Sequence, residues 1–297
     1  MAVCLILSLT GVASASGDST IESALDTAEM FSDRDLEPTA DLSATVTYTV
    51  SDGQDIHITA EGVYVLNGSA SDVTVYVEAG DEDKVQLVLD GVTVTNADFP
   101  SIYIKSADKV FVTTVSDSSL SVTGSFMADG GTNTDGVIFS RDDLTLNGTA
   151  KLTIATSENG VVTKDDLKIT GGSYEITAAS KCFEANDSIR IADGTFHLNA
   201  GTDALHAEND DDDSLGWVYI GGGNFAITSG DDGIHGHSVV QIDGGTIDVS
   251  GMSTFDYDGA GQYNGGTILV NGQQVSSLPN QMMGGASGSM GGRGRRG

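Results

Sequence analysis

Short runs of alternating apolar and polar residues recur along residues 144–249 at a nearly fixed interval. Tyr174 and Phe196 occupy equivalent positions 22 residues apart, and the next equivalent position, Phe225, follows after 29 residues because an acidic insert at 210–213 lengthens that repeat. A period of about 20 to 25 residues, with Gly, Asp and Asn between the runs, is typical of a solenoid.

Each repeat contains three alternating runs, which predicts one coil of three short strands and excludes helices over this span. Equivalent side chains in successive coils would then stack about 4.8 Å apart. We therefore predict an all-β fold, a right-handed parallel β-helix, because left-handed β-helices keep a shorter hexapeptide rhythm. The inward positions form three ladders, which begin at Leu144, Leu152 and Val161.

The remaining segments predict one elongated domain with flanking extensions. Residues 1–16 resemble a secretory signal peptide, whose apolar run is too short for a transmembrane span. We expect residues 17–43 to be a flexible acidic leader, residues 44–272 to form the β-helix with an N-terminal β cap, and residues 273–297 to be a disordered tail rich in Gly, Met and Arg. The chain is therefore expected to be secreted or at the cell surface, and monomeric.

The charge is strongly negative, with 43 acidic against 13 basic residues and a formal net charge of −30. Nucleic acid is therefore excluded as a partner, because its phosphates would be repelled. Self-repulsion on this scale would also destabilise the folded chain unless cations lie among the carboxylates.

Aligned coils predict two columns of acidic and amide side chains. Asp203 and Asp232 share one column, with Asp135 and Asn159 earlier in it, and a second column contains Asp165, Asp187 and Asn209. An ion midway between carboxylates about 4.8 Å apart would lie about 2.4 Å from each, which is a calcium–oxygen distance. We expect Ca²⁺, with these candidate ligands: Asp187, Asp203, Glu208, Asp210, Asp212, Asp231, Asp232, Asp256 and Asp258. For Asp165 and Asp243 we favour the alternative, a turn-capping role.

Several blocks resemble a known family: VQLVLDGVTVTN, FSRDDLTLNGTAKLTI, VVTKDDLKITGGSYEITA, VYIGGGNFAITSGDDGIHG and IDGGTI. They are similar to a carbohydrate-binding family of secreted clostridial proteins described as polysaccharide-lyase-like, over residues 46–270. The resemblance implies a right-handed parallel β-helix, bound calcium, and binding to plant-wall polysaccharides such as cellulose or pectin-type acidic glycans without established lyase activity. One coil departs from the pattern, since it carries Lys181 and Cys182 where its neighbours carry Asn-Gly, Asp-Ala or Asp-Gly.

Two outward ladders are candidate glycan contacts. The first contains Lys168, Arg190, Tyr219 and Gln241, and with Trp217 it offers cations and flat rings to an acidic sugar chain, although unrelated surface residues would look the same.

The second ladder places His206 and His235 next to Glu184 on the third strand of the coil. Two histidines with no third aligned nitrogen make a weak zinc site, so we expect a solvated face or a hydrogen bond to sugar.

Three functions follow from these features. The favoured one is an extracellular, calcium-dependent, non-catalytic polysaccharide-binding protein. The second is a calcium-dependent, pectate-type lyase in which Arg190 or Lys181 removes a ring proton, although neither lies in a recognisable catalytic motif. The third is a structural surface adhesin in which the solenoid is a spacer.

Overall fold

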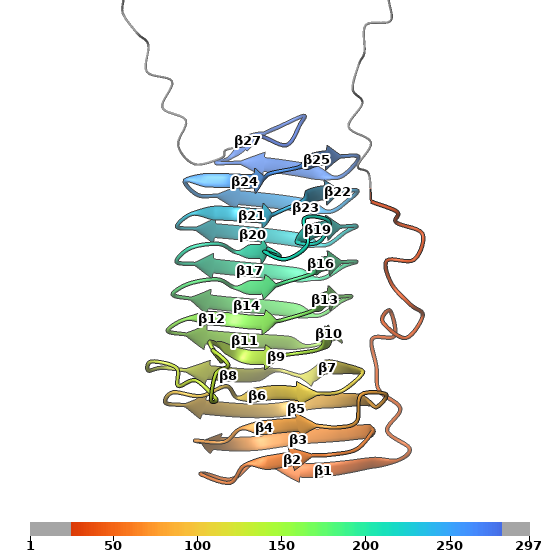
Figure 1. The fold of residues 1–297 in the computed structure, drawn as a ribbon, viewed down its shortest axis with the longest axis vertical. Helices are drawn as coiled ribbons and strands as arrows, with labels where there is room; N and C mark the ends of the chain where they lie inside the picture. The colour runs from red at the N-terminus through yellow and green to blue at the C-terminus, as the bar shows by residue number, and fades with distance from the viewer. Residues whose placement is uncertain (1–24, 281–297) are drawn as a thin grey trace, which may run out of the picture.

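The computed structural model describes residues 25–280, whose regular structure consists of β-strands wound into stacked coils (Figure 1). Equivalent strands of successive coils pair in parallel, and the last pair, β26 with β27, is antiparallel. The all-β parallel solenoid is therefore confirmed, while its right-handed winding and N-terminal cap stay predictions. No helix among residues 25–280 is long and apolar enough to cross a membrane.

The coils have three faces, and two long strands, β3 (Gly62–Ser71) and β5 (Lys84–Asn96), run through the corner between the first and second faces. The first face also contains β1 (Thr45–Thr49), β7 (Lys109–Ser116), β10 (Asp143–Gly148), β13 (Asp166–Ile169), β16 (Ser188–Ile191), β19 (Trp217–Ile220), β22 (Val239–Ile242) and β25 (Ala260–Tyr263). The second contains β8 (Ser118–Val122), β11 (Lys151–Thr156), β14 (Ser173–Ala178), β17 (Thr195–Ala200), β20 (Asn224–Ser229), β23 (Thr246–Ser250), β26 (Thr267–Val270) and β27 (Gln273–Gln274). The third is a nine-stranded sheet of β2 (Ile56–Ile58), β4 (Val75–Glu78), β6 (Ile102–Ser106), β9 (Gly136–Ser140), β12 (Asn159–Thr163), β15 (Phe183–Ala185), β18 (Leu205–Ala207), β21 (Asp232–Gly236) and β24 (Ser253–Tyr257).

The core is a set of apolar ladders inside the coils, in the register that the 22-residue period predicts. Tyr174 pairs with Phe196, and Phe196 with Phe225. The rings of Phe196 and Phe225 stack with centroids 4.3 Å apart, and Phe196 is 0% exposed. Such stacks add to the burial of large apolar side chains, so the ladder stabilises neighbouring coils against each other.

Glycines occupy the corner that precedes the third face, because neighbouring coils approach closely there. A Cβ added at Gly201 would lie 2.0 Å from the carbonyl oxygen of Ala179, and one added at Gly230 would lie 2.0 Å from that of Gly201. This corner leads directly into Asp203 in one coil and Asp232 in the next, so the glycines allow the stacking that brings those carboxylates together.

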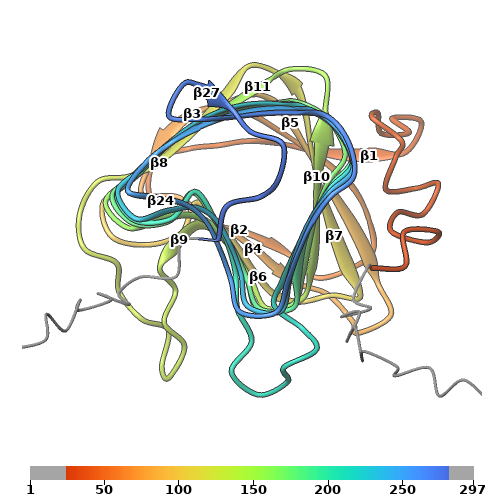
Figure 2. The same cartoon turned by 90° about the horizontal axis from the view of Figure 1, so that it is seen from above.

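Of the expected leader at 17–43, residues 25–43 are described, and they lie along the outside of the first face (Figures 1 and 2). We call residues 25–43 the strap. Met30 is 5% exposed and Asp35 is 0% exposed, and Phe31 contacts Tyr219. Asp35 Oδ1 lies 2.6 Å from Lys109 Nζ, and this ion pair holds the strap against β7.

The structure describes only part of the predicted ends of the chain. Residues 273–280, at the start of the expected disordered tail, are described, and Val275 and Leu278 pack against the core. The predicted signal peptide at 1–16 and the rest of the tail, from 281 on, lie outside the described residues.

Two loops border the outer side of the third face. Residues 123–135 lead into β9, and residues 208–216 follow β18 and include the acidic insert. Seen from above, the first loop projects in yellow-green and the second in teal, at the two margins of the sheet (Figure 2). The outer side of the third face therefore lies between them.

Candidate functional site

Three aspartates meet at the corner before the third face, and we call Asp203, Asp231 and Asp232 the acidic cluster. Each offers a carboxylate oxygen within 4.8 Å of the others. Asp203 and Asp232 are each 7% exposed. The Oδ1 atoms of Asp231 and Asp232 are buried without a hydrogen-bond partner. Stacking of successive coils thus brings together acidic groups from positions about thirty residues apart, which supports the first predicted column.

The column differs from the prediction at its beginning. Asn159 pairs with Gly136 and not with Asp135, so Asp135 lies one residue out of register. Its Oδ1 is nevertheless buried without a hydrogen-bond partner, and burial, with the nearby charge of Glu184, raises its pKa. In the next coil the Lys181 backbone amide donates to Asn159 Oδ1 at 2.9 Å. This bond is equivalent to the one that Asp203 accepts from the Asp232 amide, so at this position of the column an amide oxygen stands where a later coil has a carboxylate.

Electrostatic repulsion is visible in the pKa values of the acidic cluster. Burial, reinforced by the charges of Asp203, Asp256 and Asp231, raises the pKa of Asp232 to about 6. Burial acts in the same direction on Asp203, but the contact with His206 and the Asp232 amide, which donates to Asp203 Oδ1 at 3.0 Å, lower its pKa below the usual value. Within the acidic cluster, Asp232 is therefore the carboxylate whose charged form is most disfavoured.

The donor set of the acidic cluster fits calcium. Calcium takes six to eight oxygen ligands from carboxylates, carbonyls and water. Three carboxylates within reach of one another, two of them with a buried unpartnered oxygen, supply such ligands. A buried polar atom without a partner costs about 1–3 kcal/mol, and a bound dication would remove that cost.

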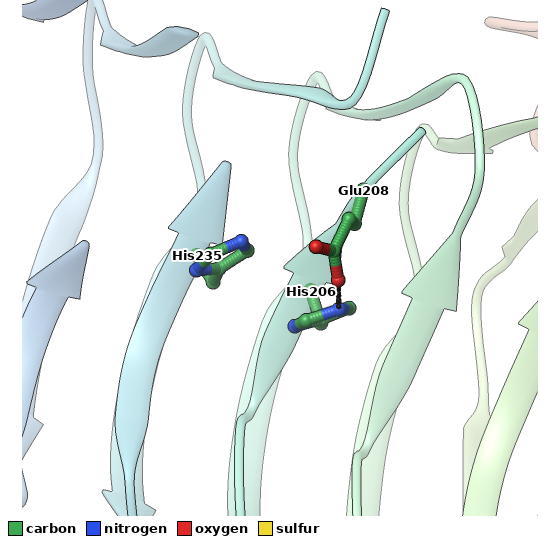
Figure 3. Close-up of side chains that lie close together, drawn as sticks. All are labelled: His206, Glu208 and His235. Carbon is green, nitrogen blue, oxygen red and sulfur yellow. Dashed lines mark hydrogen bonds and ion pairs between the residues drawn. The ribbon is translucent and has the colours of Figure 1, made fainter. Parts of the chain in front are cut away.

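A second group lies beside the acidic cluster on the outer side of the third face. Glu184, His206, His235 and Asp256 occupy one register position in successive strands. The imidazole rings of His206 and His235 stack with centroids 4.6 Å apart, and Glu208 Oε2 lies 3.0 Å from His206 Nε2 (Figure 3). The register expected for the histidine ladder is therefore observed, but the carboxylates that contact His206 are Asp203 and Glu208, not Glu184. Glu184 instead lies 3.3 Å from Lys181 Nζ.

The second predicted column is assembled as well. Asn209 Nδ2 donates to Asp187 Oδ1 at 2.9 Å, and the Asp187 amide donates to the Asp165 carbonyl. Asp165 Oδ1 accepts the amide of the following residue, as the turn-capping role predicts.

Asp165 also belongs to a group with Asp143 and Asp166, whose oxygens lie within 4.8 Å of one another. Burial, and then the charges of Asp143 and Asp166, raise the pKa of Asp165 to about 6. Sequence reasoning missed Asp143 and Asp166, although the repeated Asp-Asp-Leu at the start of β10 and β13 was a usable signal.

The other predicted metal ligands lie apart from these groups. Asp210 is exposed on the insert, and Asp212 is exposed and caps Ser214, whose amide and hydroxyl donate to it at 2.9 and 2.7 Å. Asp258 is exposed and lies 3.7 Å from His237 Nδ1. The structure therefore does not bring these three carboxylates into the acidic cluster.

The first-face ladder is not the open surface that the sequence suggested, because the strap lies over it. Tyr219 is 8% exposed and Gln241 is 2% exposed, and Gln241 Oε1 accepts the Leu25 amide at 2.8 Å. Lys168 lies 3.5 Å from Asp35 Oδ2. An outward-pointing residue of a strand is buried when another segment covers it, and here the chain covers its own ladder.

The two residues considered as lyase bases are both engaged. Arg190 donates to Asp166 Oδ2 at 2.6 Å and lies over the Trp217 ring. Lys181 forms its ion pair with Glu184. A general base has to be free to accept a proton, and both groups are held by a carboxylate instead.

A recess of about 310 Å³ opens on the third face next to the histidine pair. Its charged lining comes from the sheet and from the insert: Lys164, Lys181, Glu184, His206, Glu208, Asp210 and Asp211. Two lysines thus face four carboxylates, so the recess is acidic overall.

The chain is similar to known proteins in sequence and in fold. A family model described as carbohydrate-binding domain-containing protein matches residues 52–278. A protein of that description from Acetivibrio thermocellus is 37% identical over 130 residues, which cover 42% of this chain and 46% of the relative. The chain thus spans about half the length of that relative. A solved structure, the gadolinium derivative of a polysaccharide lyase-like protein from C. thermocellum, superposes with a TM-score of 0.69 at 28% identity, covering 75% of this chain and 99% of that one.

Proposed function

The chain belongs to the family of carbohydrate-binding domain-containing proteins, and from that premise we propose that it is an extracellular, calcium-dependent polysaccharide-binding protein that does not cleave its ligand. The observation that carries the calcium dependence is the acidic cluster, with buried carboxylate oxygens that lack a partner beside an acidic recess. A right-handed winding of the coils is part of the same proposal.

Asp203, Asp231 and Asp232 would hold the calcium ion. Bound there, it would neutralise repulsion between neighbouring coils and supply a positive centre for oxygen ligands of a sugar.

The glycan would lie along the third face, across the recess. With two lysines against four carboxylates, the recess repels an acidic polysaccharide unless dications are present. Lys181 and Lys164 have side chains 23% and 37% exposed, so both can reach a sugar carboxylate. A calcium-bridged acidic glycan of the pectin type therefore fits this surface, and cellulose is the neutral alternative.

Two parts of the proposal rest on separate observations. The extracellular setting rests on the predicted signal peptide at 1–16. The absence of cleavage rests on the ion pairs that hold Arg190 and Lys181. Incubation with polygalacturonate and calcium should give no absorbance from unsaturated products. If such absorbance appears, the non-catalytic function is refuted and the protein is a lyase.

Retention on insoluble polysaccharide tests the binding itself. The protein should be retained by calcium-treated pectin and released by EDTA, and Lys181→Ala should weaken retention. Lys151→Ala is the matched control, because Lys151 is an exposed lysine on the second face that also pairs with a glutamate. Retention that is unchanged by EDTA would refute the calcium dependence. Equal losses of retention in both lysine variants would contradict binding of the glycan on the third face.

A further inference from the structure

The histidine pair on the third face has a geometry that a solvated surface does not require. Both ring nitrogens of His235 are buried without a hydrogen-bond partner. His206 is 9% exposed, and its ring lies parallel to that of His235 within 16°. Buried polar atoms without partners are rare in folded proteins, and each calls for an explanation such as an ion.

Carboxylates lie behind both rings. Asp203 Oδ2 is 2.9 Å from His206 Nδ1, at ion-pair distance but without hydrogen-bond alignment. Asp232 Oδ2 and Asp256 Oδ2 are each 3.7 Å from His235 Nδ1. Histidines that bind a metal usually turn their other ring nitrogen to a carboxylate or carbonyl, which fixes the tautomer and the ring orientation. The Nδ1 atoms here face such carboxylates.

Glu208 adds a third donor on the solvent side. Its Oε2 lies 3.0 Å from His206 Nε2, and Figure 3 shows the carboxylate above the His206 ring, with His235 on the neighbouring strand. One donor atom from each of the three residues lies within 4.8 Å of the other two. Ligands of a tetrahedral ion with bonds of about 2.0–2.1 Å are about 3.3 Å apart, so the pair His206–Glu208 already has a suitable spacing.

We propose that His206, His235 and Glu208 form a binding site for a zinc-like transition-metal dication, separate from the oxygen-only acidic cluster. Two imidazole nitrogens and one carboxylate are donors that zinc and its neighbours accept, whereas calcium prefers oxygen alone. Glu208 has 45% of its side chain exposed, which leaves the solvent side of the site open to water or to a sugar hydroxyl.

Asp232 links this site to the acidic cluster. It is 7% exposed, its Oδ1 has no hydrogen-bond partner, and it offers an oxygen within 4.8 Å of donors on His235 and Asp256. A nine-tenths buried carboxylate directed at the histidine pair is expected beside a cation and is costly without one.

Zinc titration in saturating calcium tests the site, with protein purified without a histidine tag. Calcium occupies oxygen-only sites, so the wild type should still bind one zinc ion per chain. His235→Gln and Glu208→Gln should each lower zinc affinity by about 100-fold or more, because loss of an outer-shell partner alone lowers metal affinity about 10- to 100-fold. His197→Gln is the matched control, since His197 is an exposed histidine on the second face.

Cobalt absorption separates this site from the calcium proposal. Cobalt bound by the wild type should show the visible d–d bands of nitrogen and oxygen coordination, and both variants should lose them. Glu208→Gln guards against misfolding, because the Glu208 side chain is 45% exposed and lies outside the apolar core. The proposal is overturned if zinc affinity is unchanged in both variants, or if calcium displaces zinc completely. Either result would leave the retention on calcium-treated pectin and its release by EDTA unchanged, so the two proposals fail separately.

Discussion

Replacing Asp35 by Asn should detach the strap from the first face while the solenoid stays folded. The Asp35 side chain is 1% exposed, and it faces the ammonium groups of Lys109 at 2.6 Å and Lys168 at 3.5 Å. Those lysine side chains are 10% and 13% exposed. Breaking one partner out of a buried ion pair costs about 3–5 kcal/mol, and 3 kcal/mol shifts the ratio of docked to detached strap by about 100-fold.

The same ion pair predicts the pH dependence of strap docking. Although burial acts to raise it, the pKa of Asp35 is held well below its usual value by the bonds from Lys109 and Ser32. Burial, and then the charge of Lys109, lower the pKa of Lys168, which disfavours the charged form of Lys168. Of the two lysines, Lys109 is therefore the more favourable ion-pair partner of Asp35. A carboxylate with a lowered folded-state pKa contributes stability above its unfolded value of about 3.9 and loses it as the pH falls further. Docking should therefore be constant between about pH 5 and 8 and weaken below about pH 4.

Trp217 reports the detachment, because it is the chain's single tryptophan and lines a recess together with Leu25 and Met30 of the strap. Asp35→Asn should shift its emission to the red and speed hydrogen exchange in residues 25–43, with little change in the exchange of the core strands. Asp33→Asn is the control, since Asp33 is exposed on the same segment. Emission and exchange identical to the wild type would refute the role assigned to Asp35.

Three further predictions concern the stability of the solenoid. Calcium at about 100 times its Kd should stabilise the folded chain by about 2.7 kcal/mol, so removing that calcium with EDTA should lower the melting temperature by about 5–10 °C. An unchanged melting curve would reject the acidic cluster as an ion site. Asp203→Ala should cost about 2–3 kcal/mol in urea unfolding, more than Asp243→Ala, because Asp203 is buried and accepts the amide of a neighbouring coil, while Asp243 is only half-buried and its bond across coils is to the exposed Asn264; equal costs would contradict this. Phe196→Ala should cost about 3–5 kcal/mol by the same measurement, since it removes a fully buried ring from the stack, and a loss below about 1 kcal/mol would show that the ladder does not stabilise the coils.

The solenoid was predictable because residues one sequence period apart are the residues that pack against each other in neighbouring coils. Side chains that recur every 22 residues, such as Tyr174 and Phe196, are those that stack in neighbouring coils. The column of Asp203 and Asp232 follows from the same register, which is why these acidic residues could be paired before the structure was known. The misplacement of Asp135 by one residue arose where the loop at 123–135 interrupts the repeat.

The strap was not predictable from alternation, because it has no regular strands and its contacts span large sequence separations. Asp35 reaches Thr145 Oγ1 and Lys168, more than one hundred residues away. A ladder that points outward was taken as exposed, and nothing in the local pattern shows that a distant segment covers it. Burial of Tyr219 is therefore a property of the tertiary structure alone.

The contact between Glu208 and His206 had a local signal that was overlooked. Residues two apart in a strand lie on the same side of the sheet, so Glu208 extends the side on which His206 lies. Assigning Glu208 to the acidic insert separated it from the histidine, although the insert turns away only after Asn209, whose Oδ1 accepts the amides of Asp211 and Asp212.

Calcium content tests most directly the claim that stacked coils bring carboxylates together around a cation. The measurement is elemental analysis of the purified chain after dialysis against calcium, for the wild type and for Asp232→Asn. We expect bound calcium in the wild type and about one ion fewer in the variant, with the coils still folded. Equal calcium in both proteins, or none in the wild type, would contradict it.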